Sequence, residues 1–320
     1  RPPRSTLFPY TTLFRSLIQS IPIVFGVALL TFLLFHVVGG DPVSMLLGKH
    51  ASAAEIARLR HEYGFDLPLW EQFAQYLRQI ATLDFGRSFR TRQTIQTMLA
   101  DGVTASLCLA VPAFIVSSVL SILLGLASAF FRKTLVDRAI VALSVLGLSI
   151  SALAIILFGQ YILAFKLGWF EISGFEPTFP DMIGYLLLPW ILWVLLTIGA
   201  DVRFFRTVFL EELGRDYVRT AYAKGASKPR VLLIHVLRNA MLPIITRLVI
   251  NIPFLFMGSL LLENFFGIPG LGNMTVTAFH YADWPVVKAM TFLGSLLYIA
   301  GNLLSDLLYA VADPRVSLES

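Results

Sequence analysis

The sequence holds few side chains in patterns that could carry out covalent chemistry. No G-x-x-x-x-G-K-[ST] phosphate-binding loop occurs, because Gly48-Lys49 is followed by His50 and lacks the leading glycine. No H-E-x-x-H pair and no paired cysteines are present, and the five histidines are isolated. The sequence therefore predicts no catalytic residues, no metal site and no cofactor bound by this chain, so any energy must come through another protein.

The strongest polar signal is non-covalent, a basic segment at residues 216–239 with five Lys or Arg against one Asp. Asp216 is placed to cap a short helix. The small or apolar positions of that helix recur at i, i+3, i+4 and i+7, which forms one narrow face. They are Val218, Ala221, Tyr222 and Gly225.

Gly225 can end this helix, because glycine adopts the left-handed conformation at low cost. Ser227 and Pro229 then open a second, longer helix. A first helix of this length is not stable in water by itself. We therefore expect it to dock against another surface. Its small residues suit a groove on a partner. The alternative is a solvated positive loop that only sets membrane topology.

These residues resemble a known family. RTAYAKG at residues 219–225, followed by LRNAMLP at 237–243, resembles the cytoplasmic loop of ABC importer permeases. From Leu17 to Arg315 the chain is similar to the dipeptide, oligopeptide and nickel branch, through four separate motifs in the right order. These are GDP at 40–42, DFGRS at 84–88, DYVRTA at 216–221 and the ending at 306–314.

The resemblance implies that the short helix is a coupling helix seated in a cleft of an ATPase subunit. The coupling residues it implies are Asp216, Tyr217, Arg219, Thr220, Ala221, Ala223, Lys224, Gly225, Arg238 and Asn239. It also implies a heterodimer with a second homologous permease subunit, two ABC ATPase subunits that bind ATP-Mg, and an extracytoplasmic substrate-binding protein.

Composition places the chain in a membrane. Of its 320 residues 57% are hydrophobic and 14% charged, with mean hydropathy +0.75. The net charge of +5 is spread over short loops between apolar runs, which membrane topology explains better than binding to nucleic acid. We expect an all-α integral membrane protein, and the resemblance implies that its membrane is the bacterial cytoplasmic (inner) membrane.

Six apolar runs are long enough to cross a bilayer. They are residues 17–38, 103–131, 139–165, 182–200, 241–262 and 286–311. Residues 201–238 carry eight Lys or Arg against four acids, and the positive-inside rule places this loop in the cytoplasm. With six crossings, both termini are then cytoplasmic.

Three further regions follow from this division. Residues 1–16 resemble translated sequencing-adapter sequence, so we expect a non-native extension. Residues 39–102 form an extracytoplasmic insert with a Ser52–Glu55 capping box and an amphipathic helix at 70–80; the resemblance implies that the binding protein docks there. Residues 103–315 form the permease core, with the coupling loop at 201–240.

The segment ENFFGIPGLG at 263–272 follows the fifth run, and the resemblance places it near the external gate. Residues assigned to the translocation path or gate are Asn251, Pro253, Glu263, Phe265, Pro269 and Gly270. Arg247, near the start of the fifth run, and Asp306, near the end of the sixth, lie toward the same cytoplasmic side of the membrane, where they either pair or reach the membrane surface.

The function predicted is a permease subunit that forms half of the path for peptides or a related small solute such as a nickel chelate. The alternative is an ion-coupled secondary transporter or a channel-like protein. An ion-coupled carrier typically shows two related halves and mid-span acids; here the halves differ and those acids are missing.

Overall fold

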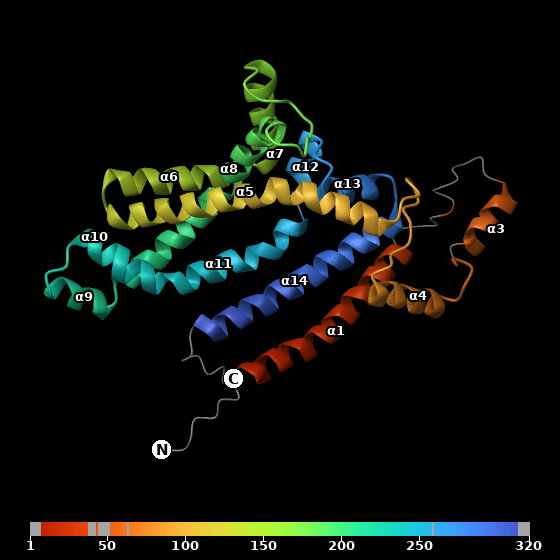
Figure 1. The fold of residues 1–320 in the computed structure, drawn as a ribbon, viewed down its shortest axis with the longest axis horizontal. Helices are drawn as coiled ribbons and strands as arrows, with labels where there is room; N and C mark the ends of the chain where they lie inside the picture. The colour runs from red at the N-terminus through yellow and green to blue at the C-terminus, as the bar shows by residue number, and fades with distance from the viewer. Residues whose placement is uncertain (1–7, 38–42, 44–51, 63, 258, 313–320) are drawn as a thin grey trace.

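The computed structural model describes residues 8–37, 43, 52–62, 64–257 and 259–312, and in these ranges the chain is helical apart from loops and one isolated bridge between Arg87 and Thr94. Long helices run side by side in an elongated molecule, with α9 and α10 at one end and α3 and α4 at the other (Figure 1). The helices are α1 (Phe8–Val37), α3 (Ala53–Glu62), α4 (Leu69–Thr82), α5 (Ile95–Phe130), α6 (Leu135–Ser149), α7 (Ala152–Gly159), η1 (Gln160–Lys166), α8 (Asp181–Leu213), α9 (Asp216–Ala223), α10 (Lys228–Arg230), η2 (Val231–Val236), α11 (Leu237–Met257), α12 (Leu260–Phe266), α13 (Leu271–His280) and α14 (Trp284–Ala312).

Several of the described helices have the length and composition of membrane spans. Within the described residues, four helices are long and apolar enough to cross a bilayer, or five if one bent pair is a single span. In α1 the apolar stretch is shorter and covers Ser20–Phe35. The chain is thus a multi-pass helical membrane protein, and six crossings stay a prediction.

The third predicted span is not one straight helix, which corrects the sequence interpretation. It consists of α6 and the continuous α7–η1 unit, set at 93° to each other. The break falls at Ile150 and Ser151, which are both extended, with ψ of 133° and 137°. Ser149 ends α6, and its hydroxyl donates to the carbonyl of Val145 at 2.8 Å. A β-branched residue between two serines supports such a break, since serine competes for backbone hydrogen bonds.

The fourth span was also placed too short. It was predicted to end at residue 200, but α8 continues to Leu213. The added turns keep an apolar face, because Val202, Phe205 and Phe209 are buried at helical spacing. The coupling loop proper therefore starts at Gly214, and the charged residues before it lie on a helix.

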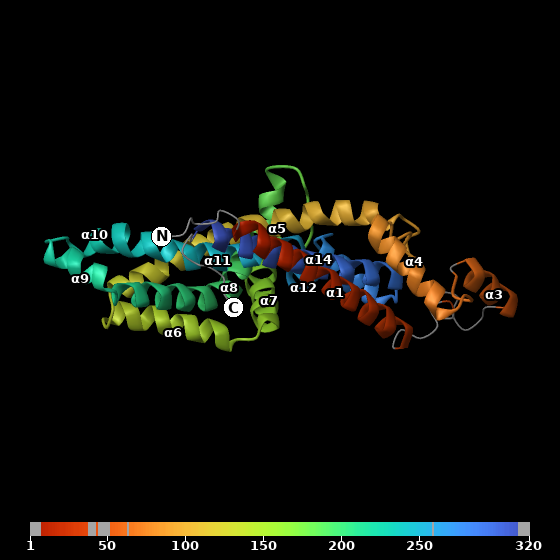
Figure 2. The same cartoon turned by 90° about the horizontal axis from the view of Figure 1, so that it is seen from below.

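The described helices form two loosely separated layers. Helices α5, α6 and α8 pack together on one side, and α11, α14 and α1 follow in turn beside them (Figures 1 and 2). The layers meet where α11 contacts α5 and α8. Many apolar side chains of α1 and α6 face outward, as expected for contact with lipid; among them are Leu30, Leu34, Leu135 and Leu143.

The structure confirms both helices that the sequence predicts in the insert. At the start of α3 the Ser52 hydroxyl donates to Glu55 at 2.8 Å, and the Glu55 amide donates back to that hydroxyl at 3.3 Å. Hydrogen bonds from the Ser52 amide and hydroxyl hold the pKa of Glu55 below its ordinary value. The amphipathic helix is α4, whose Tyr76 is buried against Phe32 of α1 with ring centroids 6.3 Å apart.

Candidate functional site

Helix α9 is the short helix predicted from the sequence, and its own chain holds it from one side. Val218 and Ala221 are 2% and 8% exposed and belong to an apolar cluster with residues of α8, η2 and α11. Its buried members include Phe205 and Phe209 of α8 and Val231 of η2. Two of the four residues of the narrow face, Val218 and Ala221, therefore pack on the protein itself, while Tyr222 and Gly225 are exposed. Docking of the helix in a groove of a partner stays a prediction.

The predicted cap is wrong by one residue. Arg215 is the N-cap and Asp216 is the first helical residue, without a side-chain capping bond. The Asp216 carboxylate instead accepts a long hydrogen bond from Arg219 at 3.4 Å. An acid in the first turn still interacts favourably with the helix dipole, although both side chains are exposed and the pair contributes little.

Gly225 ends the helix as predicted. Its φ is +82°, so the residue adopts the left-handed backbone conformation. The amide of Ala226 donates to the carbonyl of Ala221 at 3.1 Å, which closes the C-terminus of the helix. A side chain at Gly225 would meet no atom within 4 Å. The only local constraint on this residue is therefore its backbone conformation, and its surroundings are open.

The outward face of α9 is polar, with small side chains between the charged ones. It consists of Asp216, Arg219, Thr220, Tyr222, Ala223 and Lys224, which are all exposed. A shallow concavity of about 530 Å³ lies where this helix meets the following turn, and it is lined by Thr220, Lys224, Gly225, Arg230 and His235, among others. The arrangement offers a projecting cationic helix and an adjacent hollow, a form suited to docking and not to catalysis.

Two polar contacts fix α9 on its support. Tyr217 donates to the Glu212 carboxylate at 2.6 Å, and burial together with that carboxylate raises the pKa of Tyr217 to about 12. Lys228 reaches back to the carbonyl of Phe130 at the end of α5, with its ammonium 4.6 Å from that ring's centroid. Of the other predicted coupling residues, Asn239 donates to the His235 carbonyl at 2.8 Å, and Arg238 is exposed at the start of α11.

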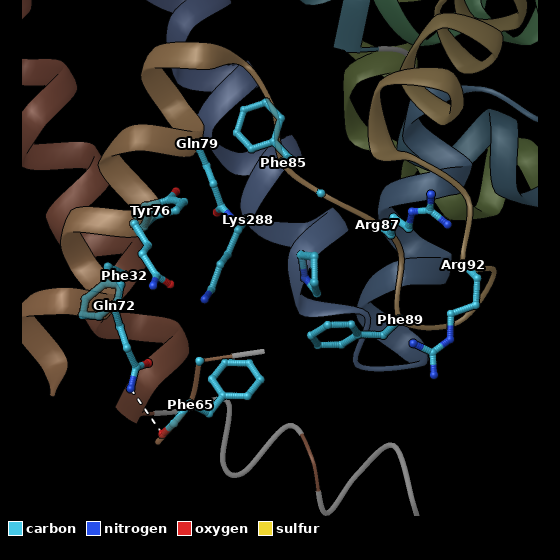
Figure 3. Close-up of a pocket in the computed structure, with 14 residues that line it drawn as sticks. Phe32, Phe65, Gln72, Tyr76, Gln79, Phe85, Arg87, Phe89, Arg92 and Lys288 are labelled. Atoms are coloured by element: carbon cyan, nitrogen blue, oxygen red, sulfur yellow. Dashed lines mark hydrogen bonds between the residues drawn. The ribbon is translucent and has the colours of Figure 1, made fainter. Parts of the chain in front are cut away.

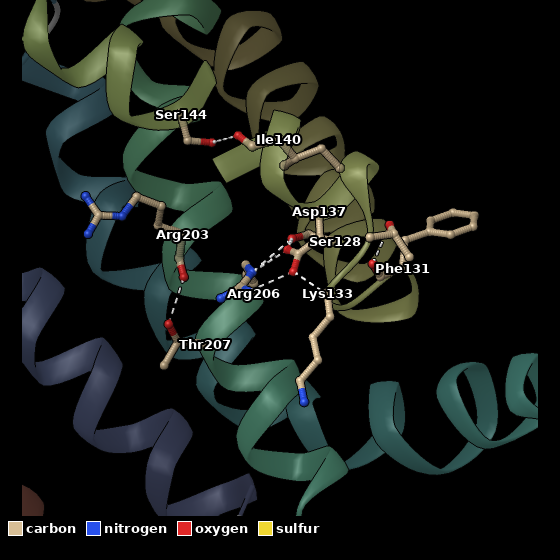
Figure 4. Close-up of polar contacts among 10 residues, drawn as sticks. Ser128, Phe131, Lys133, Asp137, Ile140, Ser144, Arg203, Arg206 and Thr207 are labelled. Atoms are coloured by element: carbon tan, nitrogen blue, oxygen red, sulfur yellow. Dashed lines mark hydrogen bonds and ion pairs between the residues drawn. The ribbon is translucent and has the colours of Figure 1, made fainter. Parts of the chain in front are cut away.

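Sequence reasoning missed an ion-pair network beneath this end of the molecule. Arg206 of α8 donates to both carboxylate oxygens of Asp137 at 2.9 and 3.1 Å, and Ser128 of α5 donates to the same carboxylate at 2.5 Å (Figure 4). The backbone amide of Lys133 adds a bond at 3.0 Å. Three helices are thus joined at one buried carboxylate, close to the turn from α5 to α6. Asp137 in a basic loop was the available signal, but its partner lies 69 residues away.

The residues assigned to the path or gate divide into two groups. Glu263 and Gly270 come together in a buried polar centre between α5, α12 and α13. The Glu263 carboxylate accepts hydrogen bonds from the Ser106 hydroxyl at 2.8 Å and from the amides of Ser259 and Asn273 at 3.0 and 3.1 Å. Burial raises the pKa of Glu263, while those donors favour its ionised form.

The other path candidates lie elsewhere or serve packing. Asn251 donates to its own helix at the Arg247 carbonyl, 3.0 Å away, and Pro253 packs closely on Gly301 of α14. Phe265 packs on an apolar cluster around α8, and Pro269 is exposed. The structure therefore places Glu263 in a structural centre and does not bring the six residues to one surface.

A third buried carboxylate, that of Asp283, holds Ser88, the last residue of the DFGRS motif. Asp283, at the turn into α14, accepts bonds from the Ser88 hydroxyl and from the Phe89 amide at 2.9 Å. This contact ties the end of the insert to the last helix. Farther along the core, Arg247 pairs with Asp201 of α8 at 3.0 Å, while the side chain of Asp306 lies outside the described residues.

The described part of the chain contains no group of three His, Cys, Asp or Glu that could hold a metal ion. Residues 121–318 match the family described as binding-protein-dependent transport system inner membrane component. Residues 10–110 match the N-terminal region of the same kind of membrane component. The chain belongs to this family.

Individual relatives agree with the family. A protein named as a peptide transport system permease of Brucella abortus (strain 2308) is 36% identical over 302 residues, covering 93% of this chain and 96% of the relative. The glutathione transport system permease protein of Salmonella typhi is 36% identical over 307 residues, covering 94% and 97%. The chain is therefore a transport permease and not an enzyme, and the carrier and channel alternatives are set aside.

Proposed function

We propose that this chain is one of two permease subunits of an ATP-driven importer, that it transports peptides or a peptide-like solute, and that α9 is its coupling helix. The named cargoes of its relatives, peptides and glutathione, support this class of solute. A nickel chelate is the further candidate within the branch that the sequence resembles.

The observation that carries the proposal is the two-sided construction of α9. Val218 and Ala221 fix the helix on α8 and η2, while its other face projects into open space with Arg219 and Lys224 exposed. A push on that face is transmitted to α8 through Phe205 and Phe209, which lie in the same cluster. Tightly packed apolar clusters transmit displacement because they are nearly incompressible.

The Arg206–Asp137–Ser128 network extends this mechanical connection. It joins α8 to α5 and α6 at the level of the α9 support, so the three helices move together when α9 moves. In the proposed cycle, ATP binding closes two partner ATPase subunits, and α9 carries that movement to the spans. Access to the path then alternates between the two sides of the membrane.

The proposed orientation follows from charge. The segment with the largest positive excess includes α9, which puts α9, the α5–α6 turn and both termini in the cytoplasm. The insert and the α12–α13 segment then face outward, where a substrate-binding protein delivers cargo. Six crossings, with α1 as the first and the bent α6–α7–η1 unit as the third, satisfy this arrangement.

A pair of substitutions at Gly225 tests the coupling role. Gly225→Asp adds negative charge beside the docking face and forces a less favoured backbone, so we expect substrate uptake by the assembled transporter to be abolished while membrane insertion is normal. Gly225→Asn is the control, because asparagine tolerates the left-handed conformation without the charge. Normal uptake by Gly225→Asp at normal abundance would remove the role assigned to α9.

A further inference from the structure

A cavity of about 540 Å³ opens at the end of the molecule remote from α9, between α4, the 84–92 loop and the ends of α1 and α14 (Figure 3). Its lining, taken over the described residues, includes three cationic side chains and no acidic one. The cations are Lys288 of α14 and Arg87 and Arg92 of the loop across the cavity. This volume lies in the range of small-molecule sites.

Lys288 is the central feature of the cavity. Its ammonium lies 5.9 Å from the ring centroid of Phe32 and 5.8 Å from that of Tyr76. These rings attract a cation without neutralising its charge. Within the part of the chain that the structure describes, Lys288 makes no ion pair. A half-buried ammonium between aromatic rings is costly unless an anion compensates it.

The remaining polar groups of the cavity suit an oxygen anion. Gln72, Gln75 and Gln79 recur on one face of α4 and line the cavity. Gln72 is held in place by donating to the Leu67 carbonyl at 2.8 Å. Amide donors beside cations are a combination that recognises groups with several oxygens, such as phosphate.

The position of the cavity favours a lipid headgroup over a soluble compound as the source of a bound phosphate group. Its walls are the end of α1, whose Leu30 and Leu34 are 69% and 56% exposed, and α4, whose Trp70 is 70% exposed. Outward leucines indicate contact with lipid tails, and an outward tryptophan on an amphipathic helix is typical of the membrane surface. The cavity mouth therefore lies at headgroup level.

We propose that this cavity binds the phosphate of an anionic phospholipid headgroup, in the leaflet on the opposite side from α9. Lys288 and Arg87 supply the positive charge, and Gln75 and Gln79 of α4 supply amide donors. A lipid bound there would bridge α4 of the insert to α1 and α14. The same chemistry would take a soluble phosphate ester, so the test must separate the two sources.

The test uses the full chain purified in neutral detergent, with native mass spectrometry as the readout. The probes are phosphatidylglycerol, phosphatidylcholine and soluble glycerol phosphate. We expect retention of phosphatidylglycerol over phosphatidylcholine, and about tenfold weaker retention by Lys288→Met, as for loss of one charge-assisted contact. Lys288→Arg should retain the lipid nearly as well as the unaltered chain. Lys166→Met, which removes an exposed lysine elsewhere, should change nothing.

Three outcomes bear on the proposed lipid site. Competition by glycerol phosphate at the same concentration as the lipid would transfer the site to a soluble phosphate ester and overturn the lipid assignment. Equal phosphatidylglycerol retention by the unaltered chain and Lys288→Met would overturn the site itself. If Lys288→Met fails to fold, Arg87→Gln replaces it, since Arg87 is at the cavity rim, and it must also weaken retention of phosphatidylglycerol but not of phosphatidylcholine.

Discussion

The α9 region and the α12–α13 segment of this permease use polar residues in opposite ways. On α9 the apolar side chains Val218 and Ala221 are buried within the chain, while the charged ones are exposed. In the α12–α13 segment the carboxylate of Glu263 is fully buried and receives donors from three directions. The α9 region leaves its polar groups exposed, and the α12–α13 segment uses them to hold its own shape.

This difference teaches how polar residues near a membrane protein's ends should be interpreted. A buried, fully bonded carboxylate specifies local structure, since leaving its donors without partners is costly. An exposed helix held from behind by an apolar cluster is free to make contacts elsewhere. The two kinds of residue therefore predict different mutant phenotypes, one in stability and one in transport.

The largest effect on stability is expected at Glu263. Glu263→Leu leaves the Ser106 hydroxyl and two backbone amides without their acceptor, at a cost of roughly 1–3 kcal/mol for each group. We expect a marked fall in the thermal denaturation midpoint of the detergent-purified chain. Glu263→Gln keeps one acceptor oxygen and should lose less. A midpoint unchanged by Glu263→Leu would contradict the structural role of this carboxylate.

An intermediate effect is expected at the network beneath α9. Asp137→Ala leaves Arg206 without its carboxylate, and removing one partner of a buried pair costs roughly 3–5 kcal/mol. The Arg206 side chain is 26% exposed, so the loss should fall below that range. Denaturation of Asp137→Ala, of Arg206→Met and of the double variant with both substitutions gives the coupling energy. If the double variant is as unstable as the sum of the singles, the pair is not coupled.

The smallest effect on stability, with a large effect on transport, is expected on the outward face of α9. Reversing both charges with Arg219→Glu and Lys224→Glu alters exposed groups only, so the stability should change by about 0.5 kcal/mol or less. Uptake by the assembled transporter should nevertheless be lost. Full uptake by this variant would contradict the docking role of the outward face. A strongly lowered stability would show that these side chains help to hold the fold.

Local features of the fold could be predicted from the sequence because neighbouring residues determine them. The Gly225 terminus, the Ser52–Glu55 capping box and the amphipathic α4 each depend on side chains within a few positions of one another. The existence of α9 followed from the same kind of pattern. The burial of Val218 and Ala221 within the chain was not predicted, because periodicity shows a narrow face without showing what covers it.

Features that depend on distant residues could not be predicted. Ser106 and Glu263 are 157 positions apart, and Asp283 accepts from the Ser88 hydroxyl across 195 positions. Each carboxylate was visible in the sequence, but its donors were not. The bend at Ile150 was equally unpredicted, since the flanking Ser149 and Ser151 are also compatible with an uninterrupted membrane helix.

The central claim is that an ATPase subunit binds α9, and cross-linking tests it most directly. In a Cys108→Ala background, Ala223→Cys places a thiol on the exposed face of α9, and Glu171→Cys places one on the loop after η1. A maleimide–benzophenone reagent is attached, and the assembled transporter is irradiated. The account predicts an adduct between the Ala223→Cys chain and the ATPase subunit, and none from Glu171→Cys. Absence of the α9 adduct in an intact complex, or an adduct from Glu171→Cys alone, would contradict it.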